Sequence, residues 1–101
     1  MMLPTVMAYM MDARPRRLAD LAAVMDPAMG TVPKAEAAER APELVREFVS
    51  GLGLPTRLSE VGVSDDDFDL IADDAMRDFV VASAPVEVSK DEIKLLLARA
   101  A

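Results

Sequence analysis

The two helical regions of this chain are separated by the stretch Gly51-Leu52-Gly53-Leu54-Pro55-Thr56-Arg57-Leu58-Ser59-Glu60-Val61-Gly62-Val63. We expect Gly51 and Gly53 to supply the positive-φ positions that close the preceding helix. A short turn around residues 56–61 follows. Ser64 then suits the start of the next helix, where its hydroxyl can accept a backbone N–H, and the acidic residues at 65–67 favour the positive end of the helix dipole.

On both sides of this stretch apolar residues recur at helical spacing, and no segment alternates as a half-buried strand would. The pattern predicts an all-α fold, a compact bundle of about five helices in a single domain over residues 1–101. We expect helices near residues 3–11, 15–25, 34–52, 64–79 and 89–101. Pro15 suits a first helical position, Pro42 predicts a kink within a continuous third helix, and Ser89 with Glu92 has capping-box spacing. The fourth helix is predicted to bury an apolar face made of Phe68, Ile71, Ala72, Ala75 and Phe79.

Composition excludes several kinds of function. The net charge of −7 argues against nucleic acid as a partner, because that affinity depends largely on Lys and Arg neutralising phosphates. Without cysteine there are no thiolate sites, and without histidine the serines have no imidazole to activate them. The lack of cysteine also fits a reducing compartment, so we expect a cytoplasmic protein.

The apolar opening, residues 1–11, would form a helix of about 16 Å, against roughly 30 Å of hydrocarbon in a bilayer. We therefore expect neither a membrane span nor a targeting segment. The residues that we expect on its apolar side could instead form a self-association face, because methionine adapts to irregular surfaces. Ordinary helix core is the alternative for the same side chains: Leu3, Val6, Met7, Met10 and Met11.

The many aspartates after Ser64 invite comparison with a calcium-binding loop. Asp65, Asp67 and Asp69 match the first three ligand positions of such a loop. Leu70, however, stands where the loop needs glycine, and Met76 where it needs a bidentate glutamate. We expect a capped, solvated helix face here, with no metal, cofactor or catalytic residue in the chain.

Several motifs resemble the C-terminal helical domain of iron-containing alcohol dehydrogenases, which have the dehydroquinate synthase-like superfold. Residues 2–9 resemble the family's Leu-Pro-x-Val-Met-x-Tyr/Phe segment, residues 14–25 the helix after it, residues 53–63 its late Leu-Pro-Thr-Arg-Leu motif, and residues 88–93 the start of its final helix. Where relatives usually have Asn-Pro-Arg, this chain has Ala84-Pro85-Val86.

The resemblance implies a parent enzyme in which Asp and His ligands hold Fe²⁺ or Zn²⁺ and a hydride moves between an alcohol and NAD or NADP. This chain, having no histidine, resembles only the part after the metal-binding region, so we expect it to be inert alone. The family's cleft implies a cleft-adjacent loop of five residues: Val80, Val81, Ala82, Ser83 and Ala84. For the isolated chain we expect a homodimer, and no small-molecule substrate.

Overall fold

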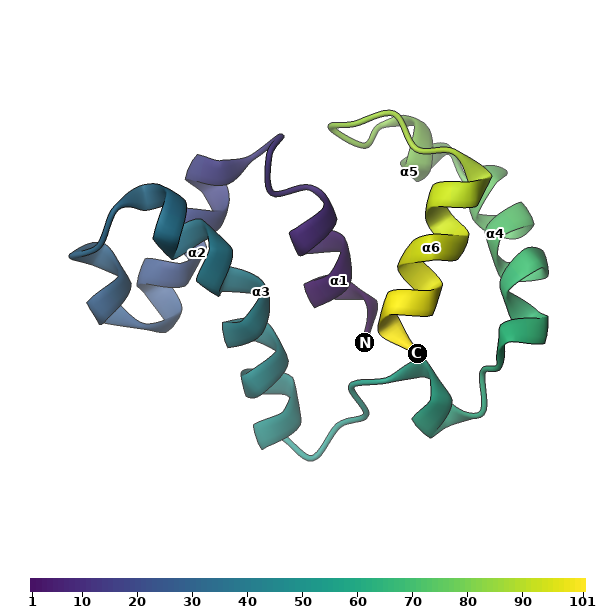
Figure 1. Ribbon diagram of the computed structural model, residues 1–101, viewed down its shortest axis with the longest axis horizontal. Helices are drawn as coiled ribbons and strands as arrows, with labels where there is room; N and C mark the ends of the chain where they lie inside the picture. The colour runs from purple at the N-terminus through teal and green to yellow at the C-terminus, as the bar shows by residue number, and fades with distance from the viewer.

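The computed structural model describes residues 1–101, and every regular element in it is helical, so the all-α class is confirmed (Figure 1). Six α-helices and three 3₁₀ turns follow one another along the chain. Their bounds are α1 Met2–Tyr9, α2 Pro15–Met25, η1 Pro27–Gly30, α3 Lys34–Gly51, η2 Leu58–Val61, η3 Asp65–Asp67, α4 Phe68–Met76, α5 Phe79–Ala82 and α6 Lys90–Ala100.

An alanine-rich core joins α2 and α3 to one side of α1. Small side chains between α2 and α3 let the two helix backbones approach closely. Met7 of α1 packs against them as a member of the same core. Partly buried methionines, Leu18, Val32 and Val49 surround it. Its buried members are Met7, Ala19, Ala22, Ala37, Ala38, Ala41, Leu44 and Val45.

Helix α3 is continuous from Lys34 to Gly51 with Pro42 inside it, as the sequence indicated. At its end only one of the two expected glycines has a left-handed backbone. Gly53 has φ +76°, whereas Gly51 is still helical, so the expectation for Gly51 was wrong. A single left-handed residue after the last turn is enough to stop a helix.

A second, smaller core lies between α4, α6 and η2. It consists of Leu58, Phe68, Leu97 and Ala100, with Met2 of α1 packed against it. Gly62, at φ +84°, turns the chain from η2 toward Ser64. A capping box between Ser64 and Asp67 then starts the turn that leads into α4, and Ser89 with Glu92 caps α6 in the same way.

The fourth predicted helix is shorter than expected. Helix α4 ends at Met76, and α5 begins separately at Phe79, because the Asp78 carboxylate accepts the Val80 N–H at 2.9 Å and so starts a new turn. The Phe79 side chain is 83% exposed and does not belong to the apolar face of α4, which corrects that prediction.

The helices form a flat array that is more open than the compact bundle we expected. Its extents are 43 × 31 × 17 Å, and its radius of gyration is 14.6 Å, against about 13 Å for a compact domain of this length. Helix α1 lies in the middle, between α3 and α6 (Figure 1). No helix is long and apolar enough to cross a bilayer.

Candidate functional site

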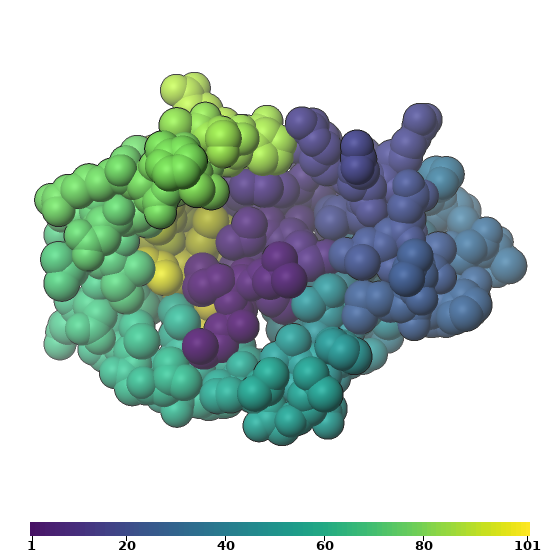
Figure 2. Space-filling model, turned by 180° about the vertical axis from the view of Figure 1, so that it is seen from behind, coloured from purple at the N-terminus to yellow at the C-terminus, as the bar shows by residue number.

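A groove of about 450 Å³ opens between α1, α6 and the region of α4 and α5. Figure 2 shows it from its open side, with purple α1 and the green α4–α5 region on either side of yellow α6. Four of the five residues predicted for the cleft-adjacent loop line it, and Ala82 lines a neighbouring hollow instead. The lining residues are Met2, Val6, Tyr9, Met10, Ala75, Val80, Val81, Ser83, Ala84, Val88, Ile93 and Leu96.

The polar groups of this groove are already engaged. The Ser83 hydroxyl donates to the Val80 carbonyl at 2.8 Å, and the Tyr9 hydroxyl donates to Glu92 Oε2. The remaining lining is apolar. Such a surface can bind apolar side chains, but it offers no free base, nucleophile or oxyanion donor. That Val80, Val81, Ser83 and Ala84 border a substrate cleft stays a prediction.

Glu92 connects two segments of the molecule beside the groove, α1 and the start of α6. Its Oε1 accepts the Ser89 backbone N–H at 3.2 Å and the Ser89 hydroxyl at 3.0 Å, while Oε2 accepts from Tyr9. Hydrogen bonds from Tyr9, then from Ser89, lower the pKa of Glu92. The same bond to Glu92 raises the pKa of Tyr9. Both shifts favour an ionised carboxylate beside a neutral phenol.

The five residues of the predicted self-association face lie in different surroundings, and their part in self-association stays a prediction. Met7 is buried in the α2–α3 core, and Met11 packs against that core from its edge. Met7 therefore fits the alternative of ordinary helix core, because α1 packs on α3 with the side that carries it. Leu3 is largely exposed, and Val6 and Met10 line the groove on another side of the helix.

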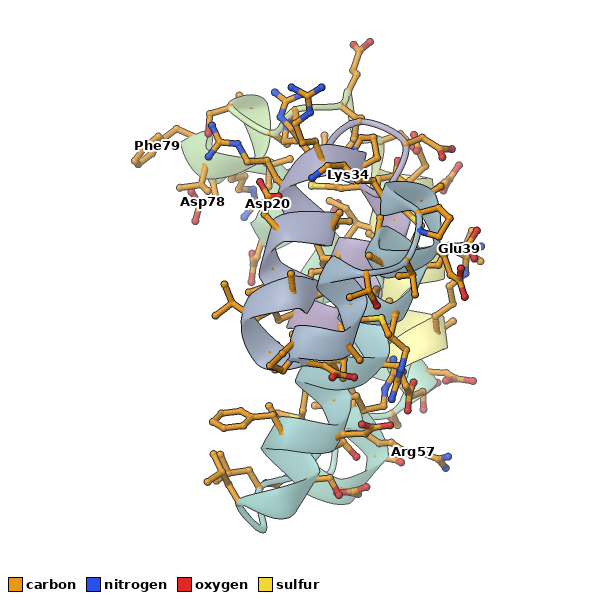
Figure 3. The ribbon with its side chains drawn as sticks, turned by 90° about the vertical axis from the view of Figure 1, so that its left-hand side faces the viewer. Asp20, Lys34, Glu39, Arg57, Asp78 and Phe79 are labelled. Carbon is orange, nitrogen blue, oxygen red and sulfur yellow. The ribbon has the colours of Figure 1, made fainter.

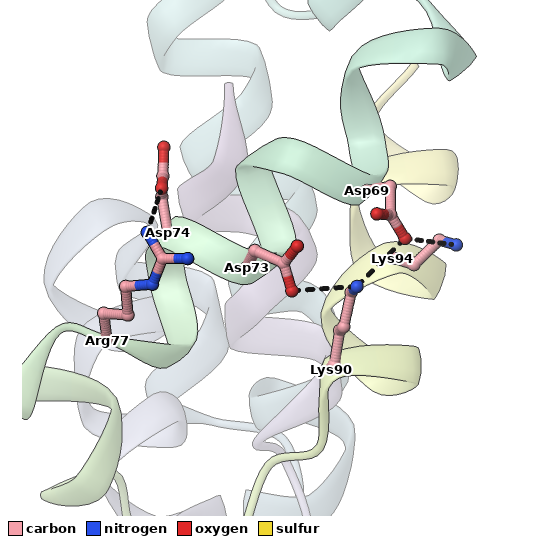
Figure 4. Close-up of polar contacts among 6 residues, drawn as sticks. All are labelled: Asp69, Asp73, Asp74, Arg77, Lys90 and Lys94. Carbon is pink, nitrogen blue, oxygen red and sulfur yellow. Dashed lines mark hydrogen bonds and ion pairs between the residues drawn. The ribbon is translucent and has the colours of Figure 1, made fainter.

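The aspartates of α4 are paired with lysines of α6 (Figure 4). Lys90 Nζ lies 3.0 Å from Asp69 Oδ1 and 2.8 Å from Asp73 Oδ1, and Lys94 Nζ lies 3.3 Å from Asp69 Oδ1. Hydrogen bonds from Lys90 and Lys94 lower the pKa of Asp69, and those to Asp73 and Asp69 raise the pKa of Lys90. These pairs join α4 to α6.

No group of three or more His, Cys, Asp or Glu side chains is arranged to hold a metal ion. Asp74, which lies further along α4, pairs with Arg77 of the next turn at 3.5 Å. The side chains of this chain therefore do not fit an iron or zinc site of their own.

Sequence reasoning missed two sets of contacts between distant segments. Glu92 was recognised as a capping residue, but its second oxygen also receives the Tyr9 hydroxyl from the other end of the chain. Lys90 and Lys94 were not connected with the acidic residues of α4. Their spacing of four, which places both on one face of α6, was the available signal.

These features define an all-helical segment with an apolar groove bordered by α1, α6 and the region of α4 and α5. The model of the Fe-containing alcohol dehydrogenase family, C-terminal, matches residues 1–101. The chain therefore belongs to the iron-containing alcohol dehydrogenase family, as part of the family's C-terminal region.

Individual relatives agree with this assignment. The chain is 29% identical over 99 residues to 1,3-propanediol dehydrogenase of Klebsiella pneumoniae, which covers 98% of this chain and 26% of that protein. It is 28% identical over 98 residues to the NAD-dependent methanol dehydrogenase of Bacillus methanolicus, covering 97% of this chain and 26% of the relative.

The fold has a close counterpart among solved structures. The crystal structure of 1,3-propanediol oxidoreductase superposes with a TM-score of 0.90 at 29% identity, over 98% of this chain and 26% of that one. The chain thus spans about a quarter of the length of the relatives that it matches.

Proposed function

We propose that this chain is the C-terminal helical portion of an iron-containing, NAD(P)-dependent alcohol dehydrogenase, and that it is catalytically inert alone. The observation that supports this proposal is that the family's C-terminal model matches all 101 residues, while the chain spans only 26% of the length of its relative. The relatives' names include an NAD-dependent methanol dehydrogenase and 1,3-propanediol dehydrogenases. A parent activity on alcohols, and a cytoplasmic location, form part of this proposal.

The side chains that are present support the proposal that the chain is inert alone. The iron or zinc that the family resemblance implies would need several ligands, and the chain has neither histidine nor a cluster of carboxylates arranged to hold such an ion. The groove contributes apolar contacts but no unengaged acid or base. The chain can therefore complete a structure without supplying the reacting groups.

The test is an assay of the purified chain with methanol and 1,3-propanediol, NAD or NADP, and added Fe²⁺ or Zn²⁺. We expect no nicotinamide reduction above that of a buffer blank. The full-length Klebsiella pneumoniae 1,3-propanediol dehydrogenase serves as the positive control. Turnover that remains proportional to the concentration of the chain would contradict the proposal.

A second candidate function is a helical protein-interaction module that self-associates. It is supported by the large apolar side chains left exposed near α1, among them Leu3 and Val80. Neither nucleic acid nor a membrane is expected as a partner. Sedimentation equilibrium tests the candidate: a mass that rises toward that of a dimer with concentration supports it, and a strictly monomeric mass contradicts it.

A further inference from the structure

No further inference is drawn: the strongest candidate, the apolar segment at residues 79–88 that borders the groove and from which Phe79 projects outward (Figure 3), contains no buried residue, but nothing in the structure shows what covers it, because the remainder of a longer chain would cover it as well as a second copy would.

Discussion

The Tyr9 hydroxyl donates a hydrogen bond to Glu92 across 83 positions of sequence, and so connects α1 to the capped start of α6. Glu92 thereby serves two segments, because its other oxygen closes the capping box with Ser89. The bond holds the two sides of the groove together at its rim.

Tyr9→Phe should lower the melting temperature modestly and flatten its pH dependence. The pKa of Glu92 is below its ordinary 4.5, so its contribution is present above that value and is lost as pH falls through the lower folded-state pKa. The pKa of Tyr9 is above 10.0, so its contribution is present below that value and disappears as pH rises through the raised pKa. Thermal melts of both proteins should therefore converge at the acid and alkaline ends. A constant difference at every pH would show that the bond is not responsible.

Ser89→Ala should destabilise the chain by about 0.5–2 kcal/mol, because the hydroxyl accepts the Glu92 N–H at 3.2 Å at the start of α6. Ser50→Ala is the matched control, since Ser50 is exposed and its change should stay within about 0.5 kcal/mol. Urea denaturation measures both. Equal values for the two variants would mean that the capping box is unimportant.

Lys90→Gln should lower the melting temperature at low salt. Lys90 of α6 pairs with Asp69 and Asp73 of α4, whereas the control Arg77→Gln removes only a local pair with Asp74, three residues away. Salt screens exposed pairs, so the loss from Lys90→Gln should shrink at high ionic strength. Melts in low and high salt compare the two variants. A loss that is unchanged by salt would point to packing by the lysine stem instead.

Two glycine substitutions should have opposite signs. Neither Gly51 nor Gly62 has an atom within 4 Å of an added Cβ, so only the backbone conformation distinguishes them. Gly51→Ala, in the last turn of α3, should stabilise by up to about 0.5–1 kcal/mol. Gly62→Ala, at φ +84°, should destabilise by about 1–2 kcal/mol. Chemical denaturation of both variants gives the values, and a shared sign would refute the assigned conformations.

Ala41→Leu should destabilise by about 1–3 kcal/mol, because Ala41 is fully buried between α2 and α3 and has no room for three more carbons. Ala35→Leu is the control on the exposed side of the same helix, with an expected change within about 0.5 kcal/mol. Denaturant midpoints compare them. A tolerated leucine at position 41 would show that α2 and α3 pack less closely than described.

Local signals in the sequence were sufficient for most of the helix boundaries. Pro15, Ser64 and Ser89 each start a helical segment through interactions with residues no more than four positions away, and such interactions can be recognised without a fold. The apolar periodicity also predicted a continuous third helix despite Pro42, and α3 is continuous. Short-range chemistry is therefore readable from this chain alone.

Features that depend on distant segments could not be predicted. Periodicity places Met7 on an apolar stripe but does not say whether that stripe meets α3 or faces outward. Phe79 continues the apolar pattern of α4, but the bond between Asp78 and the Val80 N–H starts a separate turn there. The groove itself exists because segments from both ends of the chain converge on α1.

Helix α1 belongs to both cores at once, through Met7 on one side and Met2 on the other. Either core alone is made from roughly 40 residues, about the size below which a chain seldom folds without help. The two halves should therefore unfold as one cooperative unit for as long as α1 is in place, and native-state hydrogen exchange should show a single slowest opening. A chain that started after Met11 would lose its first helix and, with it, the element whose side chains pack into both cores.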